Sequence, residues 1–232
     1  MNGRYVLIVL AIAVECLLLR LGFWQLARGT EKRVQIEALQ TVLREKNPIE
    51  LRAASAKSKA YQWARGTLSF ETDTQLLLDN QRRASKVGVV VYQLGISDSG
   101  QAFLLELGWL PVNAERQFPK PAPIRGSYTF EGLLLPPPSS GFAMGSALSA
   151  LDANRLLLTR VDLPNLAMRL KQPLAARVLR PEPLQKIGFA RDLAVSANSM
   201  PPEKHQAYAL QWFGLAVAWL LLCVYVGRRK KL

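Results

Sequence analysis

The sequence predicts an α+β membrane protein in which two transmembrane helices flank a periplasmic domain, itself an antiparallel β barrel or sandwich. Three observations predict this: an apolar run near each end, short β-rich segments between them, and a basic tail. The expected division is residues 1–28 for the first helix, 29–200 for the periplasmic domain, 201–227 for the second helix and 228–232 for a cytoplasmic tail.

The N-terminal run predicts a retained membrane anchor. Residues 5–19 are apolar except for Glu15, Arg20 interrupts the run, and residues 21–26 resume it. A cleaved signal peptide needs a small-residue cleavage site after its apolar region, and aromatic residues stand there instead. Ionisable groups inside a membrane span are costly and are often functional. Glu15 and Arg20 can instead pair with each other or extend toward the membrane surface, so a functional and a structural interpretation both stay open.

The C-terminal run is long enough to cross a lipid bilayer. Residues 208–226 contain one strongly polar residue, Gln211, and no charge. About 20 such residues, each rising about 1.5 Å, span the hydrocarbon core. Four cations follow Gly227, and a short basic tail is typically retained in the cytoplasm. Two spans therefore place both termini in the cytoplasm and the intervening domain outside, since long exported domains are translocated largely regardless of charge.

The first helix is expected to continue beyond the membrane. Residues 30–46 contain no glycine or proline, and Ile36, Leu39 and Leu43 recur at helical spacing. Asn47 and Pro48 then predict its end.

Seven segments that follow are rich in β-branched, aromatic and leucine residues, as strands are. They cover residues 61–70, 75–78, 87–96, 102–109, 124–135, 155–161 and 176–179. The run Ser97-Asp98-Ser99-Gly100 predicts a hairpin, and residues 162–170, with Pro164 in the first turn, predict a short helix. Short strands with close turn signals favour an antiparallel barrel or sandwich.

Composition excludes several classes of function. The formal charge is +13, but a domain on the outer side of a membrane is not expected to bind nucleic acid. Cys16 and Cys223 are the only cysteines, and they lie at different depths of their helices, so no disulfide is expected. One histidine cannot build a usual zinc site, and neither a P-loop nor a nucleophile elbow occurs, so an enzyme is not predicted.

The only histidine, His205, is the centre of the predicted site. Helical spacing places it on one stripe with Tyr208, Trp212, Leu215 and Trp219. A second stripe on the first helix contains Leu21, Trp24, Gln25, Arg28 and Lys32. Because the chain leaves the membrane near Arg28 and returns near His205, we expect the two stripes to meet at one depth.

A neutral imidazole is a good axial ligand for haem iron. The candidate haem site is His205 as the iron ligand, with Tyr208, Trp212, Trp24, Gln25 and Arg28 around the porphyrin and its propionates. Aromatic residues at a membrane boundary also serve as interfacial anchors, and a juxtamembrane histidine is often simply solvated. Spacing alone leaves these alternatives open.

Motifs along the chain resemble the Surfeit locus protein 1 family, the cytochrome c oxidase assembly factors. They are Leu21-Gly22-Phe23-Trp24-Gln25-Leu26-Ala27-Arg28, then Leu77-Leu78-Asp79-Asn80-Gln81-Arg82, Gly88-Val89-Val90-Val91 and Leu107-Gly108-Trp109-Leu110-Pro111, and finally Pro201-Pro202-Glu203-Lys204-His205-Gln206-Ala207-Tyr208 with Ala209-Leu210-Gln211-Trp212-Phe213. The resemblance covers essentially the whole chain, in order. One departure is Glu106-Leu107, where the family usually has Asn-Arg before Gly-Trp.

The resemblance implies a protein that binds haem a and assists its insertion into cytochrome c oxidase subunit I, with haem a synthase as a further partner. The family's proposed haem ligand falls on His205. The alternative is a structural chaperone that stabilises an oxidase subunit without ligating haem. Because no transit segment precedes Tyr5, we expect a bacterial inner-membrane member.

Overall fold

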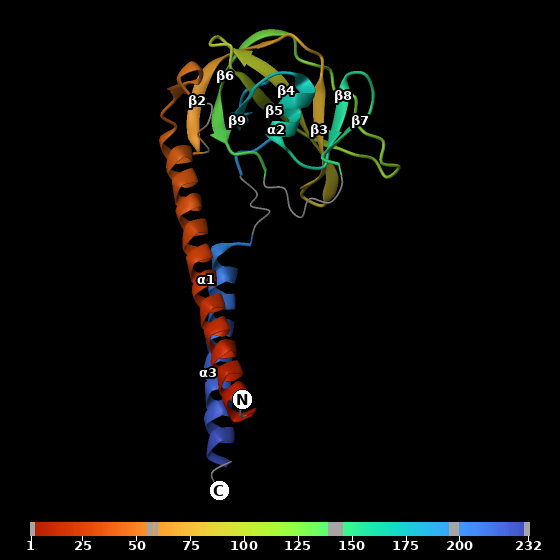
Figure 1. Ribbon diagram of the computed structural model, residues 1–232. Coiled ribbons are helices and arrows are strands. Elements are labelled where there is room, and N and C mark those ends of the chain that lie inside the picture. The colour runs from red at the N-terminus through yellow and green to blue at the C-terminus, as the bar shows by residue number, and fades with distance from the viewer. Residues whose placement is uncertain (1–2, 55–57, 59, 139–145, 195–199, 230–232) are drawn as a thin grey trace. The chain divides into compact units, whose positions relative to one another are not determined.

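The protein divides into two compact units (Figure 1). The computed structural model describes residues 3–54, 58, 60–138, 146–194 and 200–229, with the side chain of Arg4 excepted. Residues 1–38 and 199–232 form a helical unit, and residues 39–198 form a β unit.

The helical unit contains α3 (Pro202–Arg229) and the part of α1 (Gly3–Glu45) that ends at Ala38, and these two helices run side by side in opposite directions (Figure 1). Both helices are long and apolar enough to cross a membrane, as the sequence predicted. The predicted continuation of the first helix is confirmed, because α1 runs without interruption to Glu45. The second helix extends two residues past its predicted end at 227, since Arg228 and Arg229 are good helix formers whose charge suits a helix C-terminus.

The β unit is built on one sheet of nine strands. Its strands are β1 (Ile49–Glu50), β2 (Gln62–Phe70), β3 (Gln75–Arg83), β4 (Lys86–Ser97), β5 (Ala102–Pro111), β6 (Gly126–Leu135), β7 (Leu148–Ala150), β8 (Arg155–Leu158) and β9 (Leu174–Pro181). Their order is β1-β2-β6-β9-β5-β4-β3-β8-β7, and two further residue pairs join β2 to β4. The short 3-10 helix η1 (Leu51–Ala53) and α2 (Leu163–Leu170) complete the unit.

The sheet is mixed, so the predicted antiparallel arrangement was wrong. Three pairings are parallel: β1 with β2, β3 with β8, and β5 with β9. A parallel pair needs a long connection, and several other strands lie in the chain between β3 and β8 and between β5 and β9. Alternating apolar residues predict where a strand occurs but not which strand it pairs with, which explains the error.

The seven predicted strands are present, with shifted ends. β3 runs to Arg83 instead of residue 78, and its polar second half contains Asn80 at φ +57° and a register shift against β4. β1 and β7 were not predicted, because two or three residues carry no readable period.

The predicted turn and short helix are confirmed. The N–H of Gly100, at φ +78°, donates to the Ser97 carbonyl between the antiparallel strands β4 and β5. Asp162 caps α2 by accepting from the Asn165 N–H, and a proline occupies the first turn.

Two hydrophobic cores fill the β unit. One contains large side chains such as Phe103 and Phe130, and the other contains Trp63 and Tyr92. Leu39, Val42 and Leu43, from the last turns of α1, pack against the second core. The helical spacing of Leu39 and Leu43 therefore serves packing within the β unit.

A segment after β9 returns along β5 at the Leu107-Gly108-Trp109 motif. The Phe189 N–H donates to the Leu107 carbonyl (2.7 Å), and the Trp109 N–H donates to the Ala190 carbonyl (2.8 Å). Gly108 has φ +122°, and a Cβ there would lie 2.6 Å from the Phe189 carbonyl oxygen. Glycine is needed here because only a residue without Cβ allows this conformation and this approach.

We predict that Gly108→Ala lowers the free energy of unfolding by about 2–4 kcal/mol, since left-handed strain and a backbone clash add together. Gly100→Ala is the matched control, because Gly100 also has positive φ but a Cβ there meets nothing within 4 Å. Its expected loss is about 1–2 kcal/mol, from strain alone. Thermal unfolding of the detergent-solubilised protein, followed by circular dichroism, measures both; equal losses would show that the return segment yields to the added methyl.

Candidate functional site

The helices α1 and α3 approach closely where small residues face the partner helix. Gly22 is buried on α1, and a Cβ on it would lie 2.5 Å from the Phe213 ring. Ala209 and Ala216 are the buried alanines of α3. The Phe23 and Phe213 rings meet edge to face, with centroids 5.2 Å apart. Small residues let membrane helices pack backbone to backbone, so this contact sets the register of the two helices.

His205 and Gln25 form a hydrogen bond across this helix pair. His205 Nδ1 lies 2.7 Å from Gln25 Oε1. Gly29, one turn further along α1, is buried, and a Cβ there would lie 3.4 Å from the His205 Cβ. Pro201 and Pro202 precede the histidine at the start of α3, where their missing N–H groups leave no helical bond unmade. The imidazole is therefore held against α1 near the N-terminus of α3.

This bond fixes the tautomer of the imidazole. Gln25 Oε1 accepts hydrogen bonds but cannot donate them, so Nδ1 carries the proton and donates. Nε2 of the neutral ring then keeps its lone pair, and no hydrogen bond to Nε2 occurs among the described residues. Metal-ligating histidines are commonly oriented in this way, by an acceptor on the other ring nitrogen. The geometry of His205 is therefore compatible with iron ligation through Nε2.

The other predicted site residues are arranged unequally. Trp212 is half-buried on the same side of α3 as His205, whereas Tyr208 and Trp24 are exposed. Arg28 forms an exposed ion pair with Glu31 (2.6 Å). Among the described residues, it forms no hydrogen bond with the imidazole. Of the six predicted residues, the structure therefore brings His205 and Gln25 together by a direct contact. Exposed ion pairs contribute little, so Arg28 can change partners at small cost.

Two further features of the helical unit were anticipated from the sequence. Cys16 and Cys223 are free, as predicted. Glu15 lies within the apolar run of α1, and its Oε2 is buried without a hydrogen-bond partner among the described residues.

A second hydrogen bond joins α1 and α3 one turn before Glu15. The Trp219 indole N–H of α3 donates to the Ala11 carbonyl of α1 (3.1 Å). In the described part of the chain, no three His, Cys, Asp or Glu side chains gather into a metal cluster.

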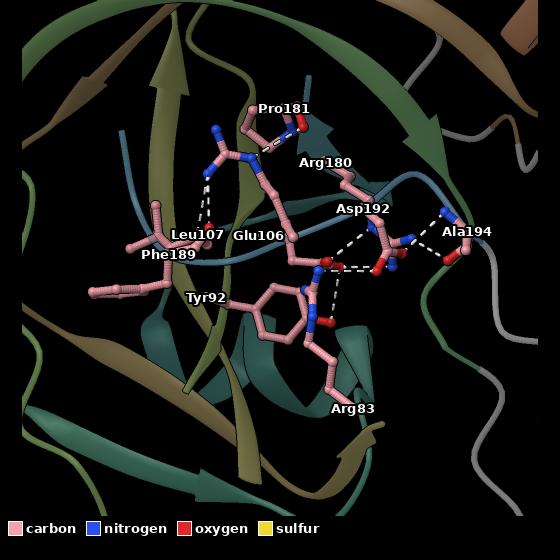
Figure 2. A network of polar contacts seen from close by, with 10 residues as sticks. Arg83, Tyr92, Glu106, Leu107, Arg180, Pro181, Phe189, Asp192 and Ala194 are labelled. Atoms are coloured by element: carbon pink, nitrogen blue, oxygen red, sulfur yellow. Dashed lines mark hydrogen bonds and ion pairs between the residues drawn. The ribbon is translucent and has the colours of Figure 1, made fainter. Parts of the chain in front are cut away.

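Sequence reasoning missed a buried charge network in the β unit, which Figure 2 shows. Glu106 of β5 and Arg180 of β9 are its centre, with side chains 6% and 12% exposed. Arg180 Nη2 donates to Glu106 Oε2 (3.0 Å), while Arg180 Nε lies 2.8 Å from Glu106 Oε1 as an ion-pair contact without hydrogen-bond geometry. The Tyr92 hydroxyl donates to the same Oε2 (3.3 Å).

The electrostatics of this network follow from its burial. Burial raises the pKa of Tyr92 well above its usual range, and the Glu106 charge raises it further, so the phenol stays protonated. Burial alone would lower the pKa of Arg180, but the Glu106 carboxylate raises it above its ordinary value. A charged residue inside the apolar run Leu104-Leu105-Glu106-Leu107 was the available sequence signal.

The network also anchors the chain segment that follows β9 (Figure 2). Arg180 Nη1 donates to the Ala194 carbonyl (2.9 Å), and Arg83 lies 3.3 Å from Asp192. Arg191 donates to backbone carbonyls of Leu107 and Phe189, among others. These contacts hold residues 189–194 on β5 and β9, so the network has a structural role in the β unit.

We predict that Glu106→Leu lowers the free energy of unfolding by about 3–5 kcal/mol, because it leaves the Arg180 cation buried without its counter-charge. The double variant Glu106→Leu, Arg180→Met removes both charges and should recover most of that loss. Chemical denaturation of the purified protein measures the cycle. Equal stability of the single and double variants would show that Arg180 is solvated when its partner is removed.

The comparisons with known proteins agree with the motifs. The model of the SURF1 family matches residues 12–217, which include most of both long helices and the whole β unit. No curated protein matches the chain. The SURF1 family is an assembly-factor family linked to cytochrome oxidase and is not a known catalytic family. With most of its length matched in one continuous region, this chain belongs to the SURF1 family.

Proposed function

We propose that this chain is a membrane-bound assembly factor that binds haem a and assists its transfer to cytochrome c oxidase subunit I. The observation that carries the proposal is the hydrogen bond from His205 Nδ1 to Gln25, which leaves Nε2 available to iron. In this proposal haem is the cargo, His205 ligates it, Trp212 contacts the porphyrin, and Arg28 exchanges Glu31 for a propionate. Haem a synthase is the donor that we expect on the supply side.

The placement that goes with this function is the bacterial inner membrane, with both termini in the cytoplasm and the β unit in the periplasm. The two apolar helices and the basic residues after Gly227 support it. His205 and Gln25 would then lie near the outer interface, where Tyr208 and Trp24 also serve as aromatic anchors.

A second candidate is a structural chaperone that stabilises an oxidase subunit without ligating haem. The close packing of Gly22 against the Phe213 ring favours it, because small residues at a helix interface serve helix association by themselves. The two candidates differ in whether haem a is bound to this chain when the protein is purified.

The topology predicts the activity of reporter fusions. Alkaline phosphatase fused at residue 100 should be active, because that position is periplasmic, and the same enzyme fused after residue 232 should be inactive. A green fluorescent protein fused after residue 232 should be fluorescent. The opposite pattern would reverse the orientation of both helices.

The haem proposal predicts that His205→Ala lowers the haem a bound to protein purified from cells that make haem a. Gln25→Leu should weaken haem binding by about 10–100-fold, because the imidazole loses its orienting acceptor, whereas Gln25→Glu keeps an acceptor and should retain haem. Haem is measured by pyridine haemochrome spectra and normalised to protein. Membrane insertion of each variant is the control, and unchanged haem in His205→Ala would favour the structural chaperone.

A further inference from the structure

Half of strand β6 has an open edge. β2 pairs with β6 from Gly126 to Leu134, all but its last residue, but β9 pairs on the other side only with Gly132–Leu135. Residues 126–129 are all exposed. An exposed row of unpaired backbone groups is a template for another strand.

The hydrogen bonds of Glu131 show which backbone groups face this edge. The Glu131 carbonyl accepts from the Glu182 N–H (2.9 Å), and its own N–H donates to the Gln185 side chain (3.3 Å). The backbone polar groups of Glu131 therefore point away from β2, and strand alternation turns those of Thr129 and Ser127 the same way. Gln185 Nε2 reaches the Thr129 carbonyl (3.3 Å), in agreement with that direction.

Three backbone groups remain available on this edge. The N–H of Thr129 and both the N–H and carbonyl of Ser127 have no hydrogen bond on that side among the described residues. The Ser127 and Thr129 hydroxyls are engaged with Ser69 and Thr67 of β2, so they stabilise the existing pair. An added strand would replace the Gln185 bond to the Thr129 carbonyl.

A groove of about 630 Å³ lies beside this edge. Its lining includes Arg125, Tyr128 and Lys186, together with Pro123, Ile124 and Ile187. Tyr128 is 40% exposed, and its ring lies against Phe70 and Phe130 with centroids 6.5 and 6.4 Å away. A strand on the β6 edge would therefore find an apolar and aromatic surface for its alternate side chains.

The charge of the groove is positive. Arg125 forms a two-point ion pair with Asp73, whose pKa the hydrogen bond from Arg125 lowers. Lys186 is exposed and forms no ion pair among the described residues. The nearby carboxylates of Glu131 and Glu182 are engaged by Trp63 and Lys46. Lys186 is thus a cation without a counter-ion at the side of an open strand edge.

We propose that the β6 edge at Ser127 and Thr129 binds an extended acidic segment of a partner polypeptide as an additional strand. Main-chain hydrogen bonds supply the affinity, and a carboxylate on Lys186 supplies the preference for acidic sequences. A second copy of this chain is disfavoured as the occupant, because a symmetric pairing of two β6 edges would bring the Lys186 and Arg125 cations of both copies together. Strand binding at this edge does not require bound haem.

The test uses the full-length protein in detergent and a fluorescent eight-residue peptide in which glutamate alternates with valine. A peptide with lysine in place of glutamate is the charge control. Fluorescence anisotropy should show binding of the acidic peptide alone. Thr129→Pro removes the outward N–H and should weaken binding by about tenfold or more, whereas Thr129→Ala loses the same hydroxyl and should bind as wild type.

Lys186→Glu keeps the test decisive if Thr129→Pro does not fold. This exposed substitution should also weaken acidic peptide binding by about tenfold and should strengthen binding of the lysine peptide. Equal binding of the two peptides, or equal binding by folded Thr129→Pro and Thr129→Ala, would overturn the proposal. A dimer of the wild-type protein that Thr129→Pro disrupts would also overturn it, because the β6 edges of two copies would then pair with each other. Haem content should be unaffected in all three variants, which separates this result from that of His205→Ala.

Discussion

The close approach of α1 and α3 at small residues is the constraint on which the candidate site depends. Gly22 accommodates the Phe213 ring, and Gly29 accommodates the side of His205, so the two helices can lie near enough for a 2.7 Å bond between His205 and Gln25. A larger side chain at Gly22 would meet the ring and separate the helices. Lipid provides no hydrophobic drive for helices to associate, so packing and such hydrogen bonds must hold the pair.

The β unit is organised by a different interaction, the buried pair of Glu106 and Arg180. Buried ion pairs are costly to desolvate, and they are retained only where geometry and further hydrogen bonds offset that cost. Here Tyr92 donates to the carboxylate, and the guanidinium also reaches the Ala194 carbonyl. The pair therefore connects β4, β5 and β9 with the segment that leads away from the sheet.

Two of the motifs noted in the sequence have different physical tasks. The motif around Gly108 permits a close backbone crossing, with φ +122° and the Phe189 carbonyl nearby. The motif around His205 instead presents an imidazole that is hydrogen-bonded to Gln25, at the start of a long apolar helix. The close crossing explains why glycine stands at position 108. The bond between His205 and Gln25 joins the helix pair and also orients the imidazole.

The sequence by itself determined the two apolar helices, their polar and basic flanks, seven of the strands, the hairpin at Gly100 and the short helix that Asp162 caps. These follow from composition, period and turn residues, which act over a few neighbouring positions. It also singled out His205, because a unique residue type is visible without a structure.

Only the tertiary structure decided the rest. Its main contacts join residues that lie far apart in the chain, as in the parallel pairing of β5 with β9. Glu106 and Arg180 are separated by 74 positions, and Gln25 and His205 by 180 positions. Local patterns contain no information about such partners, because each side chain is compatible with many neighbours until the backbone is packed. The open edge of β6 likewise exists only because β9 pairs with four of its residues and no more.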